Sequence, residues 1–225
     1  MFISDKSDLV TFECRLHFKH SNLLDQKDYY RQNKNMYSFI LQTVVCISVL
    51  HTAQGACKAP PPSANFTMKG YSGMWYEVGK VQTAGGAYFE KDCVCTTIDV
   101  QPIAASTTGD ATAVNSCRKL SPTGQFLNAT GSLTEQVTPG KWKEGLFVFV
   151  PKVDYTVIYL DDEFAIEYDC STFLGLLTNY CIHIMARHPT ANQTRVQQLL
   201  TFAEGQLGLN TDNLPFQPTK QDGCW

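Results

Sequence analysis

The sequence of 225 residues lacks an excess of charge of either sign. It has 18 lysines and arginines against 21 aspartates and glutamates, which gives a formal net charge of −3. A protein that binds nucleic acid needs a concentrated basic face, and the sequence contains no such face. The balance of charge therefore argues against a nucleic-acid partner.

Common catalytic and metal-binding motifs are also lacking. We find no Ser-His-Asp order, no G-x-S-x-G, no H-E-x-x-H and no glycine-rich phosphate loop. Cys93 and Cys95 form a C-x-C pair, but no second close pair follows to complete a zinc ribbon. We therefore expect a protein that is not an enzyme, with no metal site and no cofactor other than a bound lipophilic ligand or pigment.

No apolar run is long enough for a comfortable membrane span. The run Tyr37–Leu50 is short, follows Met36, and precedes small residues at Ala53 and Gly55. This pattern predicts a signal peptide cut before Ala56. A signal anchor is the weaker alternative. The expected organisation is a non-native N-terminal extension over residues 1–35, a signal peptide over 36–55 and one domain over 56–225.

Cysteine is abundant, with nine in the chain. Such usage favours a disulfide framework in a secreted, extracellular protein. Removal of Cys14 and Cys46 with the leader leaves seven, so at most three bridges form and one thiol remains. Three sequons support secretion and predict N-glycosylation at Asn65, Asn128 and Asn192.

The sequence of the domain predicts a series of short strands separated by turn signals. Regular spacing and short connections predict a meander of neighbouring antiparallel strands. One run is apolar on both faces, which suits a barrel better than a flat sandwich. The expected strands are 75–81, 94–101, 111–120, 125–135, 145–150, 155–160, 164–169 and 180–186.

The periodicity becomes helical once, over residues 190–207. Apolar residues there recur at helical spacing, after Pro189 and before Gly208. We expect one amphipathic helix against the outside of the barrel, followed by a tail that contains Cys224.

Four stretches of the sequence, at residues 70–78, 89–95, 164–170 and 184–189, together resemble the lipocalin family, in its apolipoprotein-D-like and crustacyanin-like branch. Gly70–Val78 (GYSGMWYEV) resembles the first lipocalin motif, and Ile184–Pro189 resembles the third. Phe89–Cys95 and Phe164–Cys170 are similar to the second and seventh strands of apolipoprotein-D-like members. The resemblance implies an all-β fold, an eight-stranded antiparallel up-and-down barrel with one C-terminal α-helix packed outside. The second motif of the family is usually T-D-Y just before the seventh strand. Residues 159–163 (YLDDE) contain an acidic residue, but at a shifted position.

The resemblance also assigns the closed end of the barrel. Gly73, Trp75 and Arg187 would form its floor, with the guanidinium lying across the indole. Alternation back from Arg187 would turn Met185, His183 and Cys181 inward.

By resemblance, Cys57 pairs with Cys170, and either Cys93 or Cys95 pairs with Cys224. A hairpin that turns near residues 106–107 places Cys95 opposite Cys117, so we expect Cys95–Cys117 and Cys93–Cys224; the converse is almost as good. Cys181 is then unpaired, and it could link to a partner or a second copy of the chain. A hairpin near 175–176 would instead pair Cys170 with Cys181.

The resemblance implies a cup that holds a small apolar molecule, such as a fatty acid, retinoid, steroid, carotenoid or bilin. Haem on His183 is a minor alternative. A secreted interaction protein with a filled barrel and a thiol-dependent lipid isomerase are the alternative functions. The expected ligand-binding wall is Phe147, Phe149, Tyr155, Val157, Tyr159, His183 and Met185.

Overall fold

The computed structural model describes residues 56–104, 106, 109–146, 151–173 and 177–225. The expected extension and signal peptide, and the wall positions Phe147 and Phe149, lie outside this part of the chain. Within it, no helix combines the length and apolarity needed to cross a membrane.

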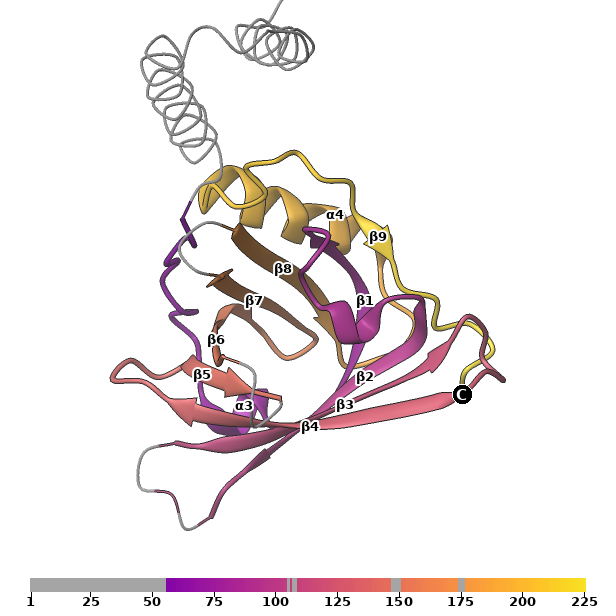
Figure 1. Cartoon of the computed structure of the whole chain (residues 1–225), viewed down its shortest axis with the longest axis horizontal. Coiled ribbons are helices and arrows are strands. Elements are labelled where there is room, and N and C mark those ends of the chain that lie inside the picture. The colour runs from indigo at the N-terminus through magenta and orange to yellow at the C-terminus, as the bar shows by residue number, and fades with distance from the viewer. Residues whose placement is uncertain (1–55, 105, 107–108, 147–150, 174–176) are drawn as a thin grey trace, which may run out of the picture. The chain divides into compact units, whose positions relative to one another are not determined.

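Eight antiparallel strands close into a barrel, as the resemblance implied (Figure 1). Each strand pairs with the next along the chain, and β1 pairs with both β2 and β8, which closes the sheet. A short ninth strand, β9 (Gln217–Pro218), adds to β1. The barrel strands are β1 (Gly73–Gln82), β2 (Cys93–Pro102), β3 (Ala111–Lys119), β4 (Phe126–Glu135), β5 (Lys141–Gly145), β6 (Val153–Leu160), β7 (Phe164–Phe173) and β8 (Leu177–Ala186).

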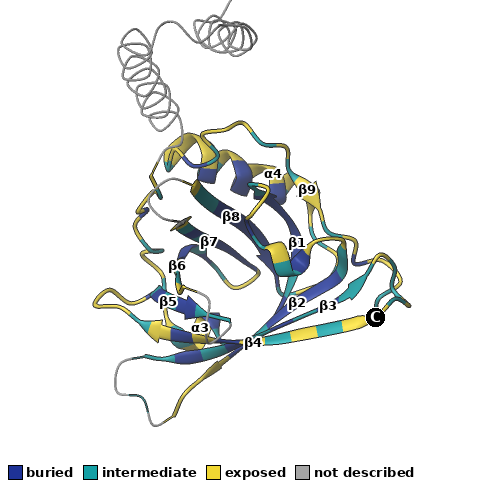
Figure 2. Cartoon of the chain, viewed as in Figure 1, coloured by how far each residue is buried: buried dark blue, intermediate teal, exposed yellow. Residues whose placement is uncertain are grey.

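A single helix covers one side of the barrel from outside. This helix, α4 (Gln193–Thr201), continues as a wider turn, η2 (Phe202–Gln206). It begins three residues later than the periodicity suggests, because the Asn192 side chain caps it by accepting from the backbone N–H groups of Thr194 and Arg195. Figure 2 shows the buried face of α4 turned toward the sheet, and this contact buries both faces of β8.

Two short helical turns bring further side chains to the barrel. The first, α3 (Met68–Tyr71), precedes β1 and buries Tyr71 in the interior. The second, η1 (Tyr88–Glu90), follows β1 and buries Glu90. Neither turn is predicted from the sequence.

The fifth strand starts earlier than the apolar pattern suggests. Of the expected strand 145–150, residues 147–150 lie outside the described residues, and the described strand β5 spans Lys141–Gly145. The chain turns at Gly140, whose φ is +84°, and Trp142 and Glu144 then alternate into the interior. The strand signal was missed because three of its five residues are charged.

Two of the three disulfides exchange partners relative to our expectation. Cys57 pairs with Cys170 as the resemblance implied, but Cys93 pairs with Cys117 and Cys95 with Cys224. The cause is an irregularity in the β2–β3 register between Val94 and Thr97. At this bulge Cys95 has a φ of +57°, and its N–H donates to the Lys220 carbonyl in the tail.

The alternative bridge between Cys170 and Cys181 is wrong, because the two cysteines are offset by one residue in the β7–β8 register. Cys170 lies opposite Tyr180, and Asp169 lies opposite Cys181. Cys170 therefore faces outward, toward Cys57. Cys181 is the unpaired thiol among the described residues and is fully buried, which argues against a disulfide to another chain through it.

Candidate ligand site in the barrel

The closed end is formed as the first and third motifs implied. The Arg187 guanidinium carbon lies 3.5 Å from the centre of the Trp75 ring. The guanidinium also donates to the carbonyls of Gly70, Ser72 and Met74. Gly73 has a φ of +91°, a conformation that favours glycine. These contacts fix the closed end of the barrel.

The half of the barrel next to the closed end, here called the lower half, is filled by its own side chains. Val157 and Met185 are fully buried there, in the cluster that contains Trp75 and Trp142. Neither Val157 nor Met185 lines either of the two cavities described below. Their expected inward orientation is confirmed, and their contact with a ligand stays a prediction.

Tyr155 lies at the boundary between the lower half and the other half of the barrel, here called the open half, which contains the cavities. Its hydroxyl is hydrogen-bonded to the hydroxyl of Tyr71, which donates to Glu167 at 2.6 Å. Burial, followed by the Glu167 charge, raises the pKa of both tyrosines well above the usual value. Both phenols therefore remain neutral and can donate or accept hydrogen bonds.

Tyr159 does not belong to the interior wall. The β6–β7 register shifts between Val157 and Tyr159, and this irregularity turns Tyr159 outward. Its ring packs against Phe202, and its hydroxyl donates to Asp161 at 2.6 Å. Strict alternation along β6 predicted the wrong face.

The open half of the barrel contains a buried group of charges. Lys80 lies between two carboxylates, 3.1 Å from Glu77 and 2.5 Å from Glu90. Burial alone would lower the pKa of Lys80, but these two carboxylates outweigh it and raise that pKa. Burial and the nearby Glu77 charge raise the pKa of Glu90 to about 7.

His183 points into this group, as alternation predicted. Its Nδ1 is 2.7 Å from Glu77, and its Nε2 is 3.2 Å from Asp169. Burial opposes the charged imidazolium, but Cys181 and the neighbouring carboxylates outweigh burial and raise the pKa of His183. Haem ligation by His183 would require the hydrogen bond between Nε2 and Asp169 to break, and it stays a prediction.

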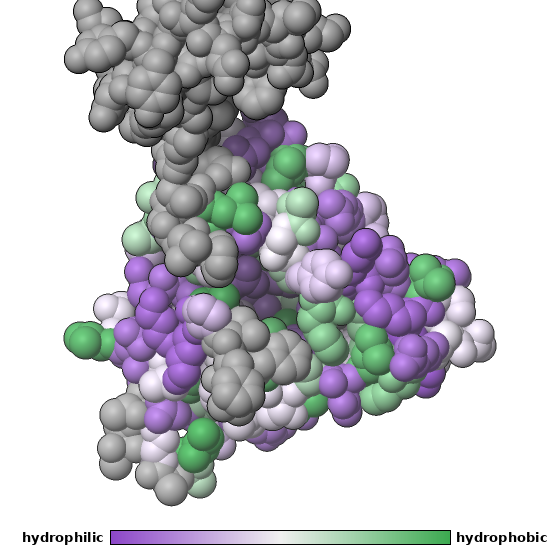
Figure 3. Space-filling view, in the orientation of Figure 1, coloured by the Kyte–Doolittle hydropathy of each residue, from purple (hydrophilic) through white to green (hydrophobic). Residues whose placement is uncertain are grey.

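Two cavities occupy the open half. A recess of about 50 Å³ is lined by residues that include Tyr155, Glu167 and His183. A larger cavity of about 670 Å³, here called the mouth cavity, adjoins it and has Tyr88 and Phe89 in its lining. The two cavities share Ala87, Phe89, Glu144, Leu146 and Asp169. Figure 3 shows the hollow in this face, with hydrophilic and hydrophobic side chains around its rim.

Glu144 is the polar group that faces both cavities from β5. Burial and the negative charge of Asp169 raise its pKa to about 8. The carboxyl is therefore largely protonated at neutral pH and can donate a hydrogen bond to a ligand.

Several polar residues of this site were not found from the sequence. Glu77 and Glu167 lie at alternate positions from Trp75 and from Ala165, on inward faces of β1 and β7. The alternation used for β8 would have placed them inside. Glu90 gives no comparable signal, because it lies on a loop turn.

Comparisons with known proteins agree with this architecture. A family model described as a lipocalin-like domain matches residues 66–219. The chain therefore belongs to the lipocalin family, which confirms the resemblance read from its motifs.

Apolipoprotein D sequences are among the relatives. That of Mus musculus is 30% identical over 139 residues, which are 60% of this chain and 68% of that protein. That of Macaca fascicularis is 26% identical over 175 residues, which are 76% of this chain and 85% of that protein.

Solved structures share the fold at low identity. Insecticyanin from the tobacco hornworm Manduca sexta matches with a TM-score of 0.55 and 18% identity, over 74% of this chain and 87% of that one. Lobster apocrustacyanin A1 matches with a TM-score of 0.50 and 15% identity, over 69% of this chain and 79% of that one. These two likenesses concern the fold alone.

Proposed function

We propose that the protein is a secreted carrier that holds one small lipophilic molecule in the open half of the barrel. The observation that carries the proposal is the mouth cavity of about 670 Å³. Small-molecule sites in proteins have volumes of roughly 300–1,000 Å³ and combine an apolar lining with a few polar groups. Membership of the lipocalin family and the kinship with apolipoprotein D support a carrier.

The lining favours a ligand with an apolar body and one hydroxyl end. Aromatic and aliphatic side chains such as Phe89 and Leu146 would contact the body. The recess beneath contains Asp169 and Glu167 besides the protonated Glu144, against one histidine, His183, so its acidic groups outnumber its basic one. A carboxylate would be repelled there, whereas a hydroxyl could bond to Tyr155. Among the classes expected, a neutral sterol or a retinoid alcohol therefore fits better than a fatty acid.

Secretion is the second part of the proposal. Three disulfides support folding in an oxidising compartment. The asparagines of the three sequons are all exposed in the domain, so each is accessible to glycosylation. The apolar run that ends before Ala56 supplies the expected signal.

The two alternative functions have less support. The filled lower half agrees with an interaction protein, but the mouth cavity would then have no role. A thiol-dependent isomerase needs a reactive thiolate facing substrate. Burial raises the pKa of the Cys181 thiol to about 12, and this residue lines neither cavity.

Fluorescence titration tests the carrier. The protein is collected from the medium of cells that express the full chain, and its N-terminal residue is determined; Ala56 is expected. A W225F background removes the tryptophan that packs outside on Tyr76 and leaves the buried Trp75 and Trp142 as reporters. A sterol or retinol should quench the fluorescence saturably, and a fatty acid should do so less.

A matched pair of variants locates the ligand. Ser171 lines the mouth, while its neighbour Thr172 is exposed on the opposite face of β7. Ser171→Phe should weaken binding at least tenfold, and Thr172→Phe should leave it unchanged. The absence of a saturable response to any fatty acid, retinoid, sterol, carotenoid or bilin would overturn the carrier proposal.

A further inference from the structure

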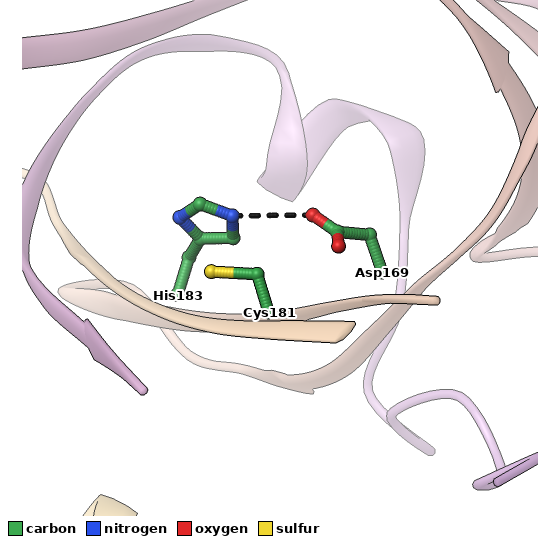
Figure 4. A group of neighbouring side chains, drawn as sticks. All are labelled: Asp169, Cys181 and His183. Atoms are coloured by element: carbon green, nitrogen blue, oxygen red, sulfur yellow. Dashed lines mark hydrogen bonds and ion pairs between the residues drawn. The ribbon is translucent and has the colours of Figure 1, made fainter. Parts of the chain in front are cut away.

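Three potential metal ligands converge inside the barrel from two neighbouring strands. Asp169 on β7 and Cys181 on β8 are direct cross-strand partners, and His183 is the next inward residue on β8. One ligand atom from each lies within 4.8 Å of the others. Figure 4 shows the carboxylate and the thiol both pointing toward the imidazole. Nitrogen, sulfur and oxygen donors are the set that zinc uses in proteins.

The separation of the nitrogen and oxygen ligand atoms fits tetrahedral coordination. Ligand atoms that lie about 2.0–2.1 Å from zinc at tetrahedral angles are separated by roughly 3.3 Å. His183 Nε2 and Asp169 Oδ2 are 3.2 Å apart. An ion could therefore replace the hydrogen bond between these atoms with little movement of either side chain.

The histidine is already oriented for this role. Glu77 is fully buried and lies 2.7 Å from Nδ1, so it holds the proton on that nitrogen. A carboxylate that binds the far nitrogen is the usual partner of a metal-binding histidine, because it fixes the ring and leaves Nε2 for the ion.

The neighbouring recess offers an open coordination position. Asp169 and His183 both line it, together with Glu167, the cross-strand partner of His183. Glu167 is fully buried, and its Oε2 has no hydrogen-bond partner among the described residues. A buried oxygen without a partner is costly, and a metal-bound water in the recess would supply one.

A second possible set, Glu77, Glu90 and His183, is already neutralised. The Lys80 ammonium occupies the place of a cation between the two carboxylates, at 3.1 Å and 2.5 Å. This leaves Asp169, Cys181 and His183 as the ligand set.

We propose that the barrel binds one Zn²⁺ ion through Asp169 Oδ2, Cys181 Sγ and His183 Nε2, with the fourth position open to the recess. The thiol proton and the Nε2 proton leave to solvent as the ion binds. The site does not rest on the carrier function, because the ion needs only the inward faces of β7 and β8.

The test uses metal alone on the full chain, without a purification tag. All samples carry Cys14→Ser and Cys46→Ser, so that Cys181 is the remaining unpaired thiol. After chelation, Zn²⁺ is titrated by competition with a chelating indicator, and Co²⁺ is used as the spectroscopic probe. We expect one ion per chain and a thiolate-to-cobalt charge-transfer band that Zn²⁺ removes.

Two variants assign the ligands. Cys181→Ser should abolish the charge-transfer band, and His183→Gln should weaken Zn²⁺ binding at least tenfold. His188→Gln, a histidine beyond the end of β8, is the matched control and should bind as the parent does. Far-UV circular dichroism checks folding, and if a variant fails to fold, the parent Co²⁺ spectrum decides.

Two results would overturn the proposal. One is a folded parent that retains no metal and shows no thiolate band. The other is wild-type affinity in both folded variants, which would place the ion elsewhere. Ligand binding is measured separately in chelator, so failure of the metal site is distinguishable from failure of the carrier.

Discussion

Substitution of Arg187 should destabilise the fold by removing several contacts at once. Its guanidinium lies on Trp75 and donates to three carbonyls, those of Gly70, Ser72 and Met74. A hydrogen bond from a charged donor contributes about 1.5–3 kcal/mol, and a cation–π contact about 0.5–2 kcal/mol. The guanidinium is partly exposed, so water replaces part of what is lost. We expect Arg187→Ala to lower the free energy of unfolding by about 2–4 kcal/mol.

Arg187→Lys tests whether stability depends on the planar shape of the guanidinium as well as on its charge. A lysine ammonium keeps the charge, but it lacks the planar fork that reaches three carbonyls while lying on a ring. We therefore expect a loss of about 1–2 kcal/mol, roughly half that of the alanine variant. Equal stability of Arg187→Lys and the parent would refute the role of planarity.

Urea unfolding measures these differences. With a slope of about 2 kcal/mol per molar urea, Arg187→Ala should shift the midpoint by roughly 1–2 M. Arg118→Ala is the control, because its guanidinium lies 5.5 Å from the exposed Phe126 ring. A loss within about 0.5 kcal/mol for Arg187→Ala, as for an ordinary surface substitution, would refute the whole argument.

Two further variants test the cavity and the helix. Burial and the Asp169 charge raise the pKa of Glu144 to about 8 in the folded protein, so the folded state holds this proton more tightly than the unfolded chain does. Stability in chelator should therefore fall as pH rises from about 5 to 8, by up to about 1.4 kcal/mol per pH unit, and Glu144→Gln should flatten that slope in urea melts at several pH values. In unglycosylated protein, Asn192→Ala removes the cap on the N–H groups of Thr194 and Arg195 and should lower the free energy of unfolding by about 1 kcal/mol. Asn192→Ser should retain most of that stability, because serine is also a good N-cap residue. Thermal melting measures both variants.

The sequence predicts the fold well because the barrel repeats a simple rule. Inward and outward positions alternate along each strand, and a residue recognised from a motif, such as Arg187, fixes which positions of β8 face inward. The inward orientation of Cys181, His183 and Met185 follows from it, and the structure confirms all three. The amphipathic helix is predicted by the same kind of periodicity.

The rule fails where one residue is inserted in a strand. A bulge changes the phase, so the residues beyond it exchange faces. This happens before Tyr159, which turns outward, and around Cys95, which turns toward Cys224. Neither insertion has a distinctive sequence signal, because the residues themselves are ordinary strand formers.

The polar interior was missed for a different reason. A search for an apolar cup selects aromatic and aliphatic residues and passes over the charged ones between them. Yet Glu77, Lys80 and His183 are all buried, and the Glu77 carboxylate contacts both Lys80 and His183, so that its charge offsets theirs. Three ligands drawn from two strands, such as Asp169 with Cys181 and His183, likewise form no motif along the chain.

This polar group sets where a ligand can lie. Charges removed from water are costly unless they are paired, so a wholly apolar molecule could not replace the solvent around Asp169 and Glu167 without loss. The lower half is closed by packing around Trp75 and Trp142. A ligand must therefore place its apolar body in the mouth and a hydrogen-bonding end against the recess. The same requirement predicts that a sterol whose hydroxyl is replaced by hydrogen binds more weakly than the parent sterol, although it is more hydrophobic.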